Sequence, residues 1–223
     1  MIVEDLRQLA YRPAWEYQEH VHQRVLEGDS ERLLLVEHPP VITFGRRPGV
    51  DRNLVASEEQ LQQLGVEVVQ SDRGGDITFH GPGQLVVYPI VRLADHRLSV
   101  GGYVHRLEDV VVATLGEFGI SAGKDPGAVG IWTEDNCQAA KICAIGVRIR
   151  RGISLHGLAL NVTTDLRYFN LIVPCGLAGR PVTSVQKMLG DRAPQMAAVK
   201  EALSNQFIAH FRSPASCHRS PIE

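Results

Sequence analysis

The sequence predicts an α+β fold in which a mixed or antiparallel sheet is flanked by helices. Segments with helical periodicity lie near both ends of the chain, and short apolar strands joined by turns fill the middle. This arrangement favours a mixed sheet over a doubly wound parallel one. No Pro/Gly/Ser-rich linker divides the 223 residues, so we expect one domain over 1–212 and a disordered tail over 213–223.

Helices are expected where apolar residues recur at spacings of three and four. They span 13–27, 57–64, 100–118 and 196–211, with a further helical turn at 165–169. Pro13 suits the start of the first helix, and Ser57 is expected to cap the second.

Strands are expected where short apolar runs end at glycine, proline or polar turn residues. They span 32–37, 41–44, 66–70, 85–91, 129–133, 141–149 and 153–162. The polar segment 134–138 predicts a hairpin between two of these strands. Pro89 indicates that its strand ends at a sheet edge or a bulge, because proline cannot donate to a ladder.

The composition excludes several classes of protein. A net charge of −2 argues against binding nucleic acid by bulk charge. No apolar run approaches the ~18–20 residues of a membrane span, and the first residues lack a signal-peptide pattern. The four cysteines show neither a CxxC pair nor zinc-like spacing, so we expect no metal site and a reducing cytoplasm.

Cys175 stands in a glycine-rich turn at the end of an apolar run. Such a turn can present a thiol and backbone N–H groups to a ligand, whereas most free cysteines are small buried apolar residues. A thiol needs a nearby cation or histidine to ionise at neutral pH. Lys141, at the head of an apolar strand, either supplies that charge from a cleft or extends its ammonium to the surface.

The glycine-rich segment RGGDITFHGPGQ (73–84) matches neither common phosphate-binding fingerprint. It is either a set of tight turns or a loop that lets a ligand lie against the backbone. Arg73 either holds an anionic or carbonyl group or is a surface residue. His80 and His156 either face a site or have structural roles.

Six segments together resemble one known family. The run RGGDITFHGPGQLVVYPI (73–90) resembles the signature of the lipoyl(octanoyl) transferases. The other segments follow the family's order: EHPPVITFGR (37–46), KICAIGVRI (141–149), SLHGLALNV (154–162), YFNLIVPCGLAG (168–179) and VTSV (182–185). The resemblance covers about residues 33 to 188.

The resemblance implies a fold like the catalytic domains of biotin and lipoate protein ligases. It implies transfer of an octanoyl group, without a cofactor, from octanoyl-acyl carrier protein to a lysine of lipoyl domains. These domains belong to 2-oxoacid dehydrogenase complexes and the glycine cleavage H protein. The family nucleophile falls on Cys175 and its paired lysine on Lys141. The implied substrate-binding residues are Arg73, Gly74, Gly75, Asp76, Ile77, Thr78, Phe79, His80, Ala144, Ile145, Gly146, Gly157, Leu158 and Ala159.

Some points stay open at this stage. Phe79 stands where the family frequently has tyrosine, and Cys143 shares a strand face with Lys141 if that strand is regular. Either Lys141 or His80 shuttles the proton. The alternatives to the transferase are an ATP-dependent ligase of the same fold and a non-catalytic acyl-binding module. Five arginines either dock acidic carrier proteins or form a solvated surface: Arg46, Arg47, Arg148, Arg150 and Arg151.

Overall fold

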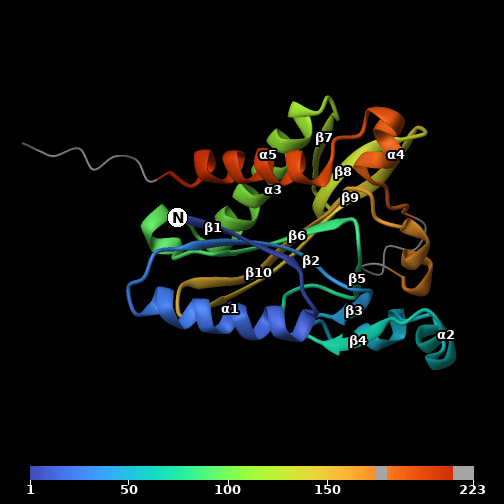
Figure 1. The fold of residues 1–223 in the computed structure, drawn as a ribbon, viewed down its shortest axis with the longest axis horizontal. Coiled ribbons are helices and arrows are strands. Elements are labelled where there is room, and N and C mark those ends of the chain that lie inside the picture. Colours follow the sequence, from blue (N-terminus) through green and yellow to red (C-terminus); the bar gives the residue numbers. More distant parts are fainter. Residues whose placement is uncertain (174–179, 213–223) are drawn as a thin grey trace, which may run out of the picture.

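A seven-stranded mixed sheet forms the centre of the molecule in the computed structural model (Figure 1). The structure describes residues 1–173 and 180–212. The strands lie in the order β1-β2-β6-β10-β9-β8-β7. Their bounds are β1 Ile2–Gln8, β2 Arg32–Glu37, β6 Gln84–Ile90, β7 Ala122–Asp125, β8 Ala128–Asp135, β9 Gln138–Arg150 and β10 Ile153–Asn161.

A smaller sheet has the order β4-β3-β5, with β3 at Val41–Phe44, β4 at Glu67–Gln70 and β5 at Thr78–His80. Each sheet contains one parallel pair, β1 with β2 and β3 with β4, and its other pairs are antiparallel. The expected mixed sheet in an α+β fold is therefore confirmed.

Helices cover both faces of the large sheet (Figure 1). Helix α1 (Tyr11–Leu26) packs on one face, and α3 (Val100–Glu117) and α5 (Met196–His210) pack on the other. Alternate residues of one strand therefore enter different cores: Leu34 and Val36 meet α1, whereas Leu33 and Leu35 join the core of α3 and α5. Burial on both faces explains why these strands are continuous apolar runs.

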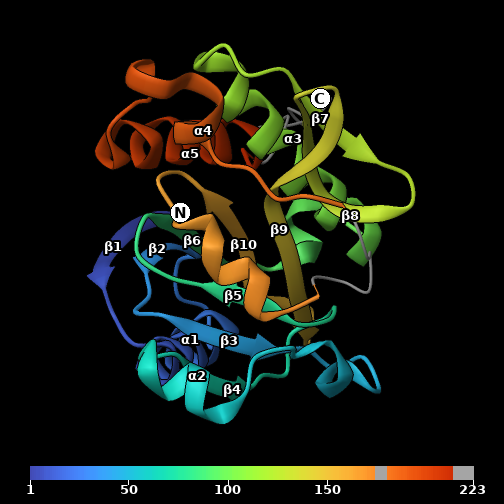
Figure 2. The same ribbon diagram turned by 90° about the vertical axis from the view of Figure 1, so that its right-hand side faces the viewer.

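The small sheet lies beside the N-terminal part of α1, with α2 (Glu58–Gln63) next to it (Figure 2). The Ser57 side chain accepts a hydrogen bond from the Gln60 N–H, so the expected helix cap is confirmed. Helix α4 (Val185–Leu189) lies with α5 at the opposite end of the molecule (Figure 2). Short 3₁₀ segments complete the described chain at Val50–Asn53, Leu93–His96, Leu166–Leu171 and Gly190–Arg192.

Besides the short 3₁₀ segments and the three-residue strand β5, three elements lie where no helix or strand was expected. Strand β1 is mostly exposed, β7 has four residues and α4 has five, so none carries an apolar period long enough to detect. The prediction for Pro89 was partly wrong, because β6 is a central strand. The β6–β10 ladder runs to the Val87–Leu158 pair and resumes only as a bridge between Arg92 and Ile153.

The side chain of Ser154 fills this interruption. Its Oγ accepts the Val91 N–H at 2.9 Å and donates to the Pro89 carbonyl oxygen at 2.7 Å. The serine hydroxyl therefore pairs with two backbone groups, the Pro89 C=O and the Val91 N–H, at the point where the regular ladder is interrupted.

Two predictions fall outside the described residues: the nucleophile Cys175 and the tail over 213–223. Among the helices of the described chain, none is both long and apolar enough to cross a bilayer.

Candidate active site

A cavity lies where the glycine-rich loop and the small sheet meet β9 and β10. Its volume is about 60 Å³, well above the ~10–15 Å³ that admits a single water. Small residues of the two central strands form its floor, and a smaller recess of about 20 Å³ shares Lys141, Ala144 and Ala159 with it. The full lining is Tyr11, Arg73, Gly75, Asp76, Ile77, Thr78, His80, Val86, Tyr88, Val129, Lys141, Ala144, Ile145, Gly146, His156, Gly157, Leu158 and Ala159.

The glycine-rich loop crosses β9 in direct backbone contact. The Gly74 N–H donates to the Val147 carbonyl oxygen at 2.9 Å. A Cβ on Gly74 would lie 2.9 Å from that oxygen, and a Cβ on Gly146 would lie 2.8 Å from the Gly74 oxygen. Glycine is thus needed on both sides of this crossing, which forms one wall of the cavity.

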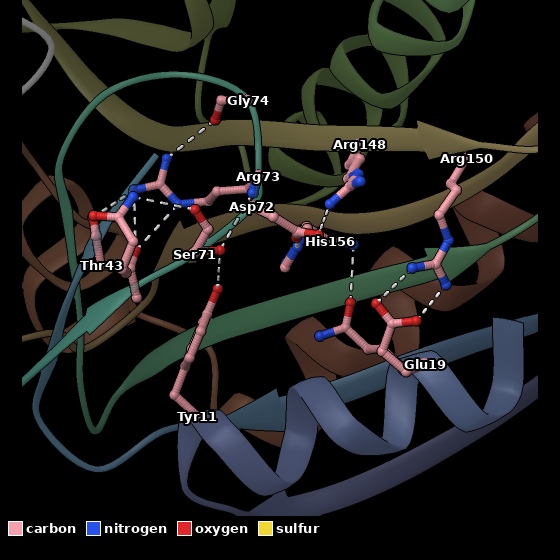
Figure 3. Close-up of polar contacts among 12 residues, drawn as sticks. Tyr11, Glu19, Thr43, Ser71, Asp72, Arg73, Gly74, Arg148, Arg150 and His156 are labelled. Carbon is pink, nitrogen blue, oxygen red and sulfur yellow. Dashed lines mark hydrogen bonds and ion pairs between the residues drawn. The ribbon is translucent and has the colours of Figure 1, made fainter. Parts of the chain in front are cut away.

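Arg73 is a buried residue of the cavity wall and not a surface arginine, since it is 7% exposed. Its guanidinium donates to the Thr43 side chain at 3.1 Å, the Thr43 carbonyl oxygen at 2.6 Å and the Gly74 oxygen at 3.2 Å (Figure 3). These contacts fix the loop to β3. They also place a positive charge beside the cavity, which helps to lower the pKa of both His80 and His156.

Asp72 ties the other side of the loop to the large sheet. Its carboxylate accepts from His156 Nε2 at 2.6 Å and pairs with Arg148 (Figure 3). Because a carboxylate only accepts, the proton of neutral His156 is assigned to Nε2. Burial, with the charges of Arg73 and Arg148, lowers the pKa of His156 to about 3.

Neutral aromatic and imidazole side chains close the end of the cavity near α1. The rings of Tyr11 and His80 stack at 6.0 Å, and Tyr88 donates to His38 Nε2 at 2.7 Å. Burial lowers the pKa of His38 to about 4 and that of His80 well below its usual value. The same burial raises the pKa of Tyr11 and Tyr88. These groups are therefore uncharged at neutral pH.

A chain of hydrogen bonds connects His80 to the strand that carries Lys141. His80 Nδ1 lies 2.7 Å from Gln84 Oε1, and Gln84 Nε2 donates to Asn161 Oδ1 at 2.9 Å. Asn161 Nδ2 donates to the Thr183 carbonyl oxygen at 3.0 Å, and the Thr183 N–H donates to the Lys141 carbonyl oxygen at 2.9 Å. Since Gln84 supplies an oxygen here, the proton of His80 is assigned to Nδ1.

The Lys141 side chain faces the cavity and is 8% exposed. Its Nζ donates to the Val129 carbonyl oxygen at 3.1 Å and lies 4.7 Å from the centre of the Trp132 ring. Both contacts stabilise a positive charge. The Arg180 guanidinium lies 3.5 Å from the centre of the same ring, so the indole contacts two cations.

Strand β9 is not regular between Lys141 and Cys143, because a β-bulge lies between them, so the two side chains do not share a face. The β8–β9 register shifts between Ile131 and Trp132, because Ile142 is an extra residue on β9. Lys141 lines the cavity, whereas Cys143 lies in the apolar core. Burial raises the pKa of the Cys143 thiol to about 12, so it is a poor nucleophile at neutral pH.

The structure brings most of the predicted site residues together. Lys141 and the expected substrate-binding residues line the cavity, except Gly74 and Phe79. Gly74 lies in the loop crossing, and Phe79 is a core residue stacked on Tyr168 at 4.7 Å. The roles of all the expected site residues toward substrate stay predictions.

Four lining residues were not predicted: Tyr11, Val86, Tyr88 and Val129. They lie in ordinary apolar stretches, so nothing in the sequence distinguishes them from core residues.

Backbone N–H groups of the glycine-rich loop and two of the five candidate docking arginines are engaged within the protein. The Gly74 N–H donates to the Val147 carbonyl oxygen, and the Ile77 N–H donates to the Asp76 carboxylate at 2.7 Å. Arg148 pairs with Asp72, and Arg150 pairs with Glu19 on α1 (Figure 3). Arg46, Arg47 and Arg151 are exposed, and Arg47 also pairs with the Asp76 carboxylate at 3.5 Å. Within residues 1–173 and 180–212, no group of three or more His, Cys, Asp or Glu is placed to hold a metal ion.

Comparison with known proteins identifies the family of this chain. Residues 10–208 match the model of the lipoyl protein ligase A/B catalytic domain. An octanoyltransferase of Bacteroides fragilis is 45% identical over 220 residues, which cover 95% of this chain and 98% of that protein.

Two solved structures have the same fold. A lipoate protein ligase of Thermoplasma acidophilum with bound lipoic acid superposes with a TM-score of 0.76 at 19% identity, covering 93% of this chain and 84% of that one. Lipoate-protein ligase A bound with ATP gives a TM-score of 0.76 at 18% identity, covering 95% and 87%. The chain therefore belongs to the lipoyl protein ligase A/B catalytic-domain family, in its octanoyltransferase group, and is an acyltransferase.

Proposed function

We propose that this enzyme transfers an octanoyl group from octanoyl-acyl carrier protein to a lysine of lipoyl domains, through a thioester on Cys175. The observation that carries the proposal is the position of Lys141 in the wall of a cavity floored by alanine and glycine. A cavity floor of small apolar residues suits a medium-length acyl chain, and an ammonium group in the cavity wall suits a thiolate and a developing oxyanion.

The described residues on either side of 174–179 support the proposed pairing of Cys175 with Lys141. Before Cys175, the Val173 N–H donates to the Asn53 carbonyl oxygen at 2.7 Å. After Cys175, the Pro181 carbonyl oxygen accepts the Lys141 N–H at 2.9 Å. Both flanks are thus held by backbone bonds, and the second is bound to the residue that carries the ammonium.

In the proposed first step, the Cys175 thiolate attacks the thioester carbonyl carbon of the carrier-bound octanoyl group. The tetrahedral intermediate collapses, the carrier thiol leaves, and octanoyl-Cys175 remains. In the second step the neutral amine of a lipoyl-domain lysine attacks this thioester. An amide forms, the Cys175 sulfur leaves, and a proton is lost from nitrogen. Since a thioester is converted into an amide, no ATP is required.

We assign the proton transfer to Lys141 and not to His80. Burial keeps the pKa of His80 well below its usual value, so the imidazolium form is unfavourable there. His80 instead orients Gln84 and, through Asn161 and Thr183, the strand position of Lys141.

The partners follow from the same proposal. The donor is octanoyl-acyl carrier protein, and the acceptors are lipoyl domains of 2-oxoacid dehydrogenase complexes and the glycine cleavage H protein, in the cytoplasm. Exposed Arg46, Arg47 and Arg151 are the docking candidates for these acidic partners. Residues 1–212 act as a single catalytic domain.

The test is incubation of the full chain with octanoyl-acyl carrier protein in the absence of ATP. Intact-mass analysis followed by peptide mapping is expected to place an octanoyl group on the peptide that contains Cys175. This adduct is expected to be labile to hydroxylamine and to disappear when a lipoyl domain is added. A Cys175→Ala variant that keeps wild-type transfer would refute the covalent route.

Repeating the incubation with ATP and free octanoate distinguishes an ATP-dependent ligase. Modification of the lipoyl domain only in that tube would favour the ligase. The absence of any transfer in either tube would favour a binding module.

A further inference from the structure

Glu108 is a buried carboxylate on the face of α3 that packs against β8 and β9. Its side chain is 5% exposed, and its helix neighbours Leu107 and Val111 belong to the apolar core. Burying a charge in such surroundings costs free energy unless partners compensate it. The hydrogen-bond partners of Glu108 therefore indicate the role of its buried charge.

The two oxygens of this carboxylate have different partners. One accepts from His105 Nδ1 at 2.9 Å, on the more exposed side of the helix. The other accepts from the Gly130 N–H on β8 at 3.5 Å. A long, charge-assisted contact of this kind fixes the direction of the Gly130 N–H rather than contributing much stability.

That N–H belongs to the peptide group that also holds Lys141. The Val129 carbonyl oxygen, in the same peptide unit, accepts from Lys141 Nζ at 3.1 Å. The C=O and N–H of a trans peptide point in opposite directions, so Glu108 and Lys141 bind this peptide from opposite sides. A carboxylate at the N–H also polarises the peptide, which makes its oxygen a better acceptor for an ammonium group.

The two sides of the peptide open onto different spaces. Val129 lines the cavity that contains Lys141, and it also lines a separate cleft that contains Glu108 and His105. Glu108 does not line the cavity, so it does not contact the acyl group proposed to bind there.

The backbone at Gly130 depends on this arrangement. Its φ is +122°, and a Cβ there would lie 2.6 Å from the Cys143 carbonyl oxygen. Only glycine fits such a position, and glycine by itself leaves the orientation of the peptide weakly determined. A fixed partner for the N–H is therefore needed to hold the carbonyl toward Lys141.

We propose that Glu108 is a positioning residue that fixes the Lys141 ammonium group in the cavity through the Val129–Gly130 peptide. This inference rests on the proposed role of Lys141 in octanoyl transfer.

The experiment compares Glu108→Ala and Glu108→Gln with Asp109→Asn in the full chain. Asp109 is the next residue of α3, with its side chain 52% exposed and paired with Lys124 at 2.7 Å, so its variant removes the same charge on the surface. Glutamine can still accept the Gly130 N–H but carries no charge, which separates the two contributions. The measurements are the labelling rate of Lys141 by acetic anhydride at pH 8, read by peptide mapping, and kcat and KM for octanoyl transfer.

Because the Glu108–Gly130 contact is long, its loss corresponds to about two- to fivefold in rate, the lower part of the range for a hydrogen bond. We expect Glu108→Ala to raise Lys141 labelling and lower kcat by about this factor, with KM unchanged. Glu108→Gln is expected to have a smaller effect and Asp109→Asn none. Unchanged Lys141 labelling in Glu108→Gln and Glu108→Ala would overturn the inference, whatever happens to thermal stability.

The two proposals can fail separately. If wild-type protein shows no octanoyl transfer but Lys141 labelling still responds to Glu108, the positioning contact stands and the proposed function falls. If transfer proceeds through Cys175 and neither labelling nor kcat responds to Glu108, the function stands and the positioning role falls.

Discussion

Replacing Ala159 with leucine tests whether the cavity holds the acyl chain. Ala159 on β10 pairs with Ala144 on β9, and both line the main cavity and its recess. Ala159 is 4% exposed, so a larger side chain at this position has to occupy cavity space. The substitution is therefore expected to shorten the slot.

The magnitude follows from the number of methylenes displaced. Each buried methylene contributes ~0.8 kcal/mol, so excluding two costs ~1.6 kcal/mol. This corresponds to about fifteenfold in kcat/KM for an octanoyl donor. A hexanoyl donor is shorter by this length and is expected to lose little, so the octanoyl-to-hexanoyl preference should fall about fifteenfold.

The assay compares kcat/KM for octanoyl- and hexanoyl-carrier proteins in wild type, Ala159→Leu and Ala139→Leu. Ala139 is an exposed residue of β9 and serves as the matched control. Thermal unfolding checks that both variants are folded. A folded Ala159→Leu enzyme that loses the same factor with both donors, or with neither, would refute the assignment of this cavity to the acyl chain.

Three further outcomes are expected. Because the folded-state pKa values of His38 (about 4) and His156 (about 3) lie below the usual value of 6.5, their stabilising contribution is complete above pH 6.5 and is lost on acidification. On going from pH 7 to pH 5, each of these two histidines should lower the free energy of unfolding by about 2 kcal/mol. Urea unfolding curves that coincide at the two pH values would contradict this.

In native protein at pH 8, iodoacetamide is expected to label exposed Cys137 and to leave buried Cys143 unlabelled until urea is added; early labelling of Cys143 would show that the core opens there. An Arg73→Lys variant loses the two-pronged hydrogen bonding of the guanidinium to Thr43 of β3 and should lower kcat/KM at least about tenfold. A change of less than twofold in steady-state kinetics would show that the guanidinium has no special role.

Much of the fold was predictable because its strands are buried on both faces. The run from Leu33 to Val36 has no polar break, and it supplies residues to both cores. The hairpin of β8 and β9 was predictable from its polar turn, where Asn136 and Cys137 adopt positive φ. Strand β1 was not predictable, because its mostly exposed side chains have no apolar alternation.

The candidate site was predictable only through the family resemblance. The residues alone left Lys141 open between the surface and a cleft, and left Arg73 open between a ligand contact and the surface. The structure shows both to be buried, Arg73 in the loop that crosses β9 and Lys141 against Val129 and Trp132. That crossing joins residues more than seventy positions apart, so no local pattern could have indicated it.

The position of Lys141 depends on three irregularities that act together. The extra residue Ile142 turns the Lys141 side chain to the cavity and leaves Cys143 in the core. The positive φ of Gly130 turns the Val129 carbonyl oxygen toward the ammonium group. Glu108 holds the other end of that peptide from within the core.

Each of these features is unfavourable alone, because a bulge loses a ladder bond, a strand glycine is flexible and a buried carboxylate is poorly solvated. Together they place the Lys141 ammonium group in the wall of a cavity floored by alanine and glycine, where a regular hairpin would place it against the core. The local cost is thus explained by the chemistry of the cavity rather than by the stability of the sheet.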